Sequence, residues 1–203
     1  MTDAGDTDTR PPERIALGSL ELTRWQAGDL ADLQAAVSAS ISELEGWLAW
    51  ASEDRTAQRG FLETTSRCWE AGERFEYAIR VGTGVAGGVG LMRRIGPGGL
   101  EIGYWVHSAH TGRGLAKLAS AALTQAAFEL PGVDHVEIHH DEANLASRAV
   151  PAGLGFELVE RADKTPAAPL ETGTDLIWRL DRDRFPASAA RALLRRSGQG
   201  ARD

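Results

Sequence analysis

The spacing of hydrophobic residues changes along the chain, and each change marks a predicted element. Apolar residues first suggest a strand or hairpin limb over 15–25, then recur at helical spacing over 29–37, 41–50 and 54–72. From Phe75 the period becomes two, and three alternating segments follow over 75–81, 85–95 and 100–107. Glycine-containing turns separate these segments, which predicts an antiparallel meander.

The second half of the chain predicts a crossover and two closing strands. A long alanine-rich helix over 114–130 ends at Pro131-Gly132, and a strand follows from Val133. A helical crossover allows this strand to lie parallel to 100–107. A short helix over 145–153, a strand from Phe156, a loop over 161–174 and a last strand through 176–180 complete the pattern. We expect an α/β (α+β) fold with one mixed, mostly antiparallel sheet and helices on both faces.

Composition favours one globular domain of ordinary type. The 203 residues are 42% hydrophobic and 25% charged, and no run of about 18 apolar residues occurs. The start of the chain has no basic, hydrophobic leader, so we expect a cytoplasmic protein that does not enter a membrane.

The two ends of the chain differ from its middle. Residues 1–14 are rich in Asp, Thr and Pro and are expected to be disordered. Residues 182–203 hold six arginines and two aspartates, which predicts a basic, partly helical extension outside a domain spanning 15–181. The net charge of -7 disfavours general nucleic-acid binding, although the basic extension leaves an RNA or acidic partner open.

A glycine turn at residues 111–116 carries the first chemical signal. Thr-Gly-Arg-Gly-Leu-Ala follows an apolar strand and opens the alanine-rich helix. Free backbone N–H groups at a helix N-terminus bind anions, so this turn predicts a cradle for a pyrophosphate. The sequence lacks a GxxxxGK[ST] loop and a full GxGxxG with a later acidic residue, which argues against nucleotide hydrolysis and dinucleotide binding.

A second segment, Asn144 to Phe156, gives the turn a more specific meaning. With both segments in this order, the chain resembles the GCN5-related N-acetyltransferase (GNAT) superfamily, which binds acetyl-CoA. The run Glu101-Ile102-Gly103-Tyr104-Trp105 and the early Trp47 and Trp50 look like its RimJ/RimL-like, ribosomal-protein branch. The resemblance implies a sheet that splays between the fourth and fifth strands.

The resemblance also implies which residues hold the cofactor. Val106 and His107 would lie along the pantetheine arm, and Asn144 would bind its amide. The phosphates would meet the turn, whose members are Thr111, Gly112, Arg113, Gly114, Leu115 and Ala116. Thr111 stands where the family has Gln or Arg, and its hydroxyl could still donate to a phosphate oxygen.

Three residues are candidates for catalysis. Glu101 fits the family's strand glutamate and could remove a proton through water, although it could also only pair with an arginine. His140 is the second candidate base. Ser147, which completes Asn-x-x-Ser, could protonate the departing thiolate, while Asn144 and Ser147 could alternatively serve only as helix caps.

Two further features remain open. Pro151 lacks an N–H, so the Ser147 carbonyl loses its usual helical partner, and either a kink or a water could follow. The Trp47 and Trp50 pair suggests core packing more than a substrate wall. The five histidines do not share a face and no cysteine cluster or HExxH occurs, so no metal is expected.

Together these features predict direct acetyl transfer from acetyl-CoA to a primary amine. The acceptor could be a protein N-terminus or a small molecule, and the protein a monomer or a homodimer. A non-catalytic acyl-CoA-binding or sensor module with the same fold is the alternative.

Overall fold

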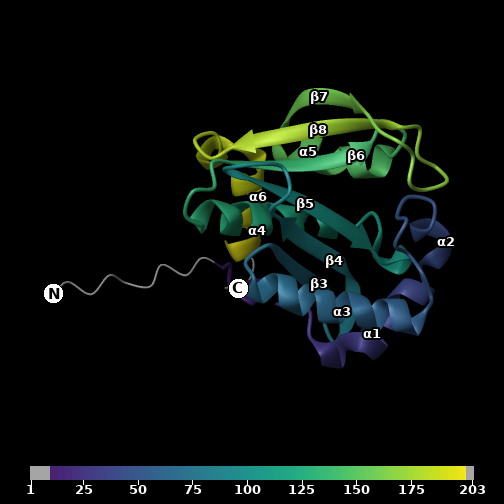
Figure 1. Cartoon of the computed structure of the whole chain (residues 1–203). Helices are drawn as coiled ribbons and strands as arrows, with labels where there is room; N and C mark the ends of the chain where they lie inside the picture. The colour runs from purple at the N-terminus through teal and green to yellow at the C-terminus, as the bar shows by residue number, and fades with distance from the viewer. Residues whose placement is uncertain (1–9, 200–203) are drawn as a thin grey trace.

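The computed structural model describes residues 10–199, which form one eight-stranded sheet with helices on both faces (Figure 1). The sheet order is β1-β2-β3-β4-β5-β6-β8-β7. The strands are β1 (Arg14–Leu17), β2 (Leu20–Arg24), β3 (Arg74–Val81), β4 (Gly84–Met92), β5 (Gly99–Val106), β6 (His135–Asp141), β7 (Glu157–Asp163) and β8 (Thr174–Asp181). The expected mixed, mostly antiparallel sheet is confirmed, and β5 with β6 is its parallel pair.

The first expected strand is a hairpin of two strands. Gly18 takes a φ of 69° between β1 and β2, a left-handed conformation that glycine adopts without a Cβ clash. Because the hairpin adds a strand, the fourth and fifth expected strands are β5 and β6 in the structure.

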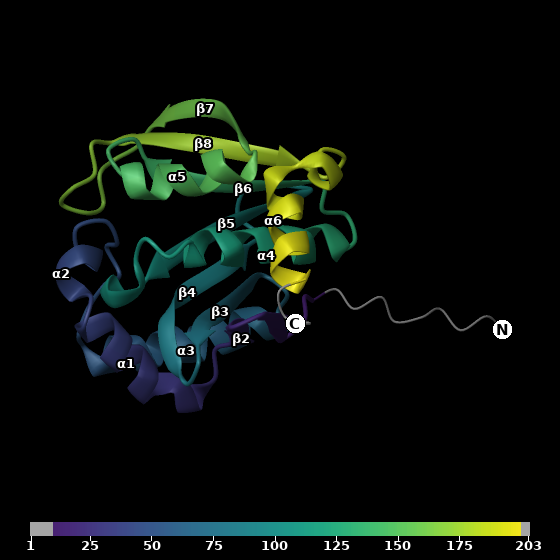
Figure 2. The same ribbon diagram turned by 180° about the vertical axis from the view of Figure 1, so that it is seen from behind.

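Helices from the two halves of the chain cover opposite faces of the sheet. α1 (Leu30–Ser38) and α3 (Arg55–Glu70) lie on one face, and α4 (Leu115–Glu129), α5 (Leu145–Leu154) and α6 (Ala189–Gln199) lie on the other (Figure 2). Short 3-10 turns occur at Ala27–Asp29, Ser108–His110 and Phe185–Ala187. Buried alanines on α4, among them Ala119, Ala122 and Ala126, let the sheet and the helices approach closely.

The predicted helix over 41–50 is wrong beyond its first turn. α2 comprises only Ile41–Leu44, and the chain then runs through turns. Trp50 is 49% exposed, so core packing is also wrong for this residue. Its ring stacks on Phe61 at 6.3 Å and meets the edge of Trp105 at 6.1 Å. Aromatic contacts therefore hold Trp50 at the surface.

β5 and β6 pair over only three residues. Gly99, Leu100 and Glu101 lie opposite His135, Val136 and Glu137, and no further pairing joins the two described strands. β5 continues to Val106 against β4, and β6 continues to Asp141 against β8. The sheet therefore opens between β5 and β6, as the resemblance implied.

The described part of the C-terminal segment packs on the domain. Arg182 donates from Nε to the Val133 carbonyl at 2.6 Å and from Nη2 to the Leu130 carbonyl at 3.0 Å. Buried Phe185 and Ala190 belong to the core that α4 covers. The expected disordered tail lies mostly outside the described residues, as do the last four residues, 200–203. None of the helices within 10–199 is long and apolar enough to cross a bilayer.

Candidate active site

The turn before α4 presents backbone donors at an uncapped helix N-terminus. Gly114 is the N-cap, with a φ of 75°, and it offers no side chain to the first turn. Gly112 has a φ of 73°, and a Cβ at either glycine would meet nothing within 4 Å. The N–H groups of Leu115 and Ala116 belong to the first turn of the helix, so they lack intrahelical acceptors and lie at the positive end of its dipole. This arrangement suits the pyrophosphate expected there.

Two polar side chains of the turn are engaged within the protein. The Thr111 hydroxyl donates to the Ser108 carbonyl at 2.9 Å, and His107 Nδ1 accepts from the Ala109 N–H at 3.0 Å. The hydroxyl proton of Thr111 is therefore already used, which argues against the expected donation to phosphate. Burial, followed by the charge of Arg113, lowers the pKa of His110.

Asn144 begins α5 as its cap. Its Oδ1 accepts from the Ser147 N–H at 2.9 Å, as the capping alternative foresaw. The carboxamide NH₂ makes no hydrogen bond to the described protein residues, so the cap leaves the donor side of Asn144 available. The side chain therefore fits both roles that the sequence suggested.

Tyr104 of β5 supplies the partner that Pro151 withholds from the Ser147 carbonyl. Its hydroxyl donates to that carbonyl at 2.9 Å and lies 3.0 Å from Ser147 Oγ. Since the single phenol proton goes to the carbonyl, Oγ donates to the phenol oxygen. Burial raises the pKa of Tyr104 to about 12, so the phenol keeps its proton. Sequence reasoning missed Tyr104, although the orphan carbonyl created by Pro151 called for a donor.

Glu101 lies on the opposite face of β5 from Tyr104, at the last residue paired with β6. It is 5% exposed, and its carboxylate accepts from Nε of Arg94 at 2.7 Å and from Nη2 of the same guanidinium. Both carboxylate oxygens are thus engaged by one cation, as the ion-pair alternative foresaw. The same bonds raise the pKa of Arg94 against the opposing effect of burial.

His140 has both ring nitrogens occupied. Nδ1 bonds the Asp141 carbonyl at 2.8 Å, and Nε2 accepts from the indole N–H of Trp178 at 3.0 Å. Burial lowers the pKa of His140 below its ordinary value of 6.5. A neutral ring with its lone pair bound to an indole N–H has no free site for a substrate proton, so this geometry argues against His140 as the base.

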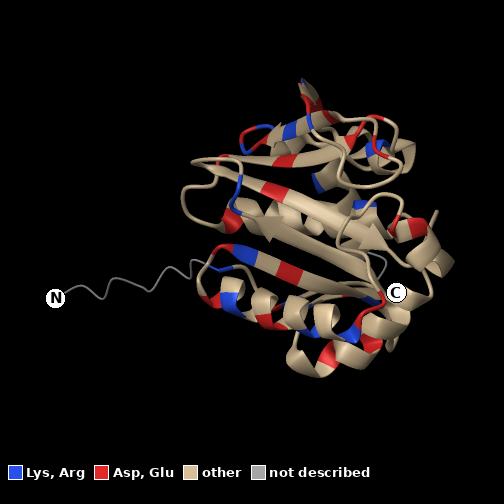
Figure 3. Cartoon of the chain, turned by 45° about the vertical axis from the view of Figure 1, so that its right-hand side comes forward, with Lys and Arg blue, Asp and Glu red and all other residues tan. Residues whose placement is uncertain are grey.

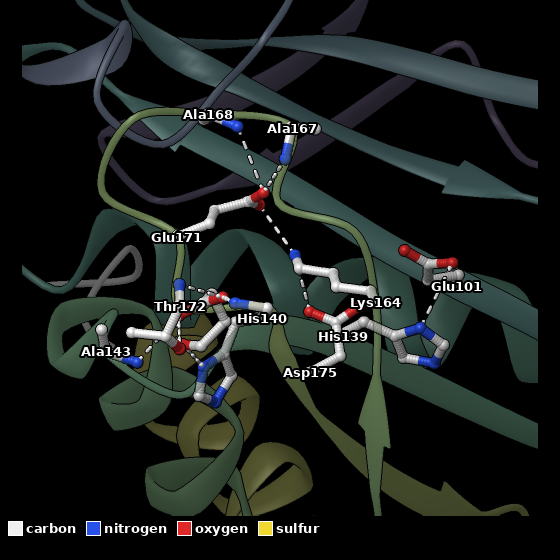
Figure 4. Close-up of polar contacts among 12 residues, drawn as sticks. Glu101, His139, His140, Ala143, Lys164, Ala167, Ala168, Glu171, Thr172 and Asp175 are labelled. Atoms are coloured by element: carbon white, nitrogen blue, oxygen red, sulfur yellow. Dashed lines mark hydrogen bonds and ion pairs between the residues drawn. The ribbon is translucent and has the colours of Figure 1, made fainter.

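His139 occupies the face that His140 does not. Its Nε2 lies 2.7 Å from Glu137 Oε2, and its Nδ1 lies 3.8 Å from Glu101 Oε2, a contact drawn in Figure 4. Sequence reasoning considered His139 only as a metal ligand. Strand alternation could have found it, because Glu137 and His139 are two residues apart and therefore share the face of Glu101.

A charged row crosses the sheet on this face. Register pairs align Glu101 of β5, Glu137 of β6 and Arg179 of β8. Arg179 donates to Glu137 Oε1 through Nε at 2.8 Å and through Nη2 at 2.6 Å. Burial opposes ionisation of Glu137, but hydrogen bonds from His139 and Arg179 together lower its pKa. Figure 3 shows acidic positions within neighbouring strands of the sheet.

Over residues 10–199, no group of three or more His, Cys, Asp or Glu side chains is arranged to hold a metal. The polar groups of the site instead pair with one another.

The sequence from residue 19 to 157 matches the family described as Acetyltransferase (GNAT) domain. The chain belongs to the GNAT acetyltransferase family. It is therefore an N-acetyltransferase by family. No curated protein matches the sequence.

Solved GNAT structures share the fold at low sequence identity. RimJ of Mycobacterium smegmatis in complex with CoA-disulfide superposes with a TM-score of 0.79 at 20% identity, covering 95% of this chain and 96% of its own. RimL, a ribosomal L7/L12 alpha-N-protein acetyltransferase in complex with coenzyme A, superposes with a TM-score of 0.76 at 19% identity, covering 83% of this chain and 98% of its own. The microcin C7 self-immunity acetyltransferase MccE, in complex with acetyl-CoA and AMP, superposes with a TM-score of 0.78 at 18% identity, covering 85% of this chain and 98% of its own.

Proposed function

We propose that this GNAT protein transfers the acetyl group of acetyl-CoA directly to a primary amine, and that the amine is a protein N-terminus. The observation that carries the proposal is the opening between β5 and β6, which lies beside the uncapped N-terminus of α4. Strand groups without a partner and helix N–H groups without acceptors can both bind a ligand in place of water. A pantetheine amide chain ending in a pyrophosphate provides both kinds of group.

The residues divide the work of binding. The N–H groups of Leu115 and Ala116 would hold the phosphates, with Arg113 adding charge beside them. The free NH₂ of Asn144 would donate to an amide carbonyl of the arm. Val106 and His107 lie at the end of β5, where their backbone would face the arm. The bound thioester supplies an activated acyl carbon and a thiolate leaving group.

Ser147 and Tyr104 would serve the departing sulfur. The Ser147 hydroxyl and the Tyr104 phenol form a pair at 3.0 Å on the α5 side of the opening. We infer that the Ser147 hydroxyl turns its proton from the Tyr104 phenol oxygen towards the thiolate and regains one from the amine nitrogen through solvent, while Tyr104 stays bonded to the Ser147 carbonyl. No covalent bond to the enzyme is required.

A cationic acceptor fits the opposite face of the opening. Buried Glu101 and Glu137 lie there, and the exposed ring of Trp50 borders the same side through Trp105. An N-terminal ammonium would meet the partly exposed His139 beside these carboxylates, and its peptide chain would meet the indole of Trp50. The fold neighbour RimL, a ribosomal L7/L12 alpha-N-protein acetyltransferase, supports this class of acceptor, and we expect the reaction in the cytoplasm.

Binding and turnover test the proposal separately. Saturating acetyl-CoA should raise the melting temperature by mass action, and peptides with free N-termini should release CoA thiol. Release with small amines but not with peptides would correct the acceptor class. A melting shift without any CoA release would favour the sensor alternative, and no shift would contradict acyl-CoA binding.

The Ser147→Ala variant tests the leaving-group role. Turnover should fall by roughly 10- to 100-fold with little change in acetyl-CoA affinity, since loss of a general acid affects chemistry more than binding. Ser66→Ala, on α3 outside the site, is the matched control. Unchanged turnover in Ser147→Ala would remove this residue from the mechanism.

A further inference from the structure

We propose that His139 is the catalytic base that deprotonates the acceptor amine, with Glu137 as its positioning residue. The inference rests on the proposed function, because it assigns a role within that reaction. It departs from the sequence-based expectation, which named Glu101 and His140.

The hydrogen bond to Glu137 fixes the tautomer of His139. Glu137 is a carboxylate held by Arg179, so it can only accept, and the nitrogen that faces it must carry a proton. Nε2 is therefore the donor at 2.7 Å, and Nδ1 keeps its lone pair. A neutral imidazole oriented by a carboxylate is the arrangement that general-base catalysis uses.

His139 borders the opening that the acceptor would enter, and its Nδ1 lies 3.8 Å from Glu101 Oε2. His139 comes from the part of β6 beyond the last pair with β5, so it borders the opening directly. Its side chain is 21% exposed, whereas those of Glu101 and Glu137 are 7% and 5% exposed. Of these three groups, the imidazole is the one that a substrate reaches from solvent.

Charged side chains surround His139 on this face of the sheet. Glu101 at 3.8 Å and Glu137 at 2.7 Å flank the ring, and each is neutralised on its far side by an arginine. Further along, Asp175 of β8 pairs with Lys164 at 2.8 Å, and Lys164 also binds Glu171 at 2.7 Å (Figure 4). The two carboxylates and the two arginines balance in charge around the ring.

The other candidates lack these properties. Both carboxylate oxygens of Glu101 accept hydrogen bonds from Arg94, and Nε2 of His140 accepts one from the indole N–H of Trp178. In this arrangement the Glu101 carboxylate lies 3.8 Å from Nδ1 and stabilises the imidazolium that forms.

The proton balance of the step is complete. The ammonium loses one proton to Nδ1, which breaks an N–H bond and frees the nitrogen lone pair. That pair forms the C–N bond as the C–S bond breaks and its electrons leave on sulfur. A second proton passes from nitrogen to sulfur, which gives the amide and the thiol. The proton on His139 then returns to solvent at the exposed edge of the ring.

His139→Gln provides the direct test, with His135→Gln as the matched control. His135 lies on the same strand and the same face, at the paired end away from the opening. We expect kcat/KM for a peptide amine to fall by about 100-fold in His139→Gln, because general-base catalysis contributes about 100- to 10,000-fold. The decline of kcat/KM at low pH, the acid limb of the pH profile, should also disappear in this variant. The acetyl-CoA melting shift should remain, and His135→Gln should retain the wild-type profile.

The Glu137→Gln variant tests whether Glu137 acts on His139 as a positioning residue or has only a structural role. The variant keeps the shape but removes the charge that stabilises imidazolium, so the acid limb should move to lower pH and kcat should fall less than in His139→Gln. Ring ¹⁵N shifts of the wild-type protein should show a protonated Nε2 and a bare Nδ1 at His139. A protonated Nδ1 in neutral His139 would overturn the assignment.

The two proposals fail in different ways. Wild-type protein that binds no acetyl-CoA and releases no thiol would overturn the proposed function and this inference together. An active wild-type enzyme whose His139→Gln variant keeps the acid limb would overturn this inference alone. With an acceptor that is already a neutral amine at the assay pH, the difference in kcat/KM between wild type and His139→Gln should be smaller. A difference as large as with an ammonium acceptor would also contradict the base role.

Discussion

The hydroxyl of Tyr104 lies 2.9 Å from the carbonyl oxygen of Ser147, joining β5 to the first turn of α5 across the opening in the sheet. The bond exists because Pro151, four residues after Ser147, has no N–H to donate. A helix defect is thus converted into a tertiary contact between the strand and the helix that border the site.

Tyr104→Phe should destabilise the protein by about 1–3 kcal/mol, because a half-buried carbonyl and a hydroxyl lose their partner together. Urea unfolding measures this change. In a Pro151→Ala background the cost should be smaller, since the substituted alanine restores an N–H for the Ser147 carbonyl. Equal costs in both backgrounds would show that Tyr104 and Pro151 are not coupled.

Gly114→Glu should abolish the melting shift that acetyl-CoA produces. The new carboxylate would stand at the helix N-terminus where a phosphate is expected, and the residue would be strained at a φ of 75°. Gly132→Glu is the matched control, because Gly132 has a φ of 72° and equally open surroundings beyond the other end of α4. A shift retained in Gly114→Glu would move the phosphate site elsewhere.

His140 should make stability depend on pH below neutrality. Burial lowers its pKa in the fold, so the unfolded chain binds more protons and stability is lost as pH falls from about 6.5 through the lower folded-state value. The wild-type protein should therefore lose more stability between about pH 7.5 and pH 5.5 than His140→Gln does. Equal losses, measured by urea unfolding, would indicate that His140 titrates normally.

Asp141 should contribute to the loss of folding stability at acid pH. Its carboxylate accepts from the N–H groups of Ala143 at 3.0 Å, Thr172 at 2.9 Å and Gly173 at 3.1 Å, and from the Thr172 hydroxyl at 2.9 Å. Burial opposes ionisation, but these bonds together lower the pKa of Asp141, so its contribution is present above about pH 4 and is lost as pH falls through the folded-state value.

Asp141→Asn should cost about 2–4 kcal/mol at neutral pH, because charged hydrogen bonds are lost and an NH₂ group faces backbone donors. The difference in unfolding free energy between wild type and this variant should shrink once the pH falls below about 4, where the wild-type carboxylate takes up its proton. Urea unfolding at neutral and at acidic pH measures both values. Asp32→Asn, at an exposed position of α1, is the control and should change stability little. A difference that stays constant across this pH range would contradict the role of the Asp141 carboxylate.

Much of the fold was predictable because local periodicity and tertiary packing agree. The alternation after Phe75 and the alanine-rich helix both place one apolar face where the core requires it. The helix over 41–50 was not predictable in the same way, because its apolar spacing reflects aromatic contacts made by Trp50 across the surface rather than a helical face.

The site was predictable where backbone conformation carries the chemistry. Gly112 and Gly114 have left-handed φ values, and a glycine in the sequence marks a position where such a value is allowed. The roles of Glu101, His139 and His140 depend on which partners reach them from distant strands. Arg94 and Trp178 decide two of those roles, and neither contact follows from local spacing.

The short β5–β6 pairing has a mechanical consequence. Three residue pairs, and two bonds from Asp134 and His135 to the Gly98 carbonyl, join β5 to β6 at one end, so contacts such as that of Tyr104 hold the two strands elsewhere. Under the proposed function, an acyl donor that bonds both strand edges would join the two halves of the sheet while it is bound. Release of CoA would then remove that link and loosen the sheet at the end of each cycle.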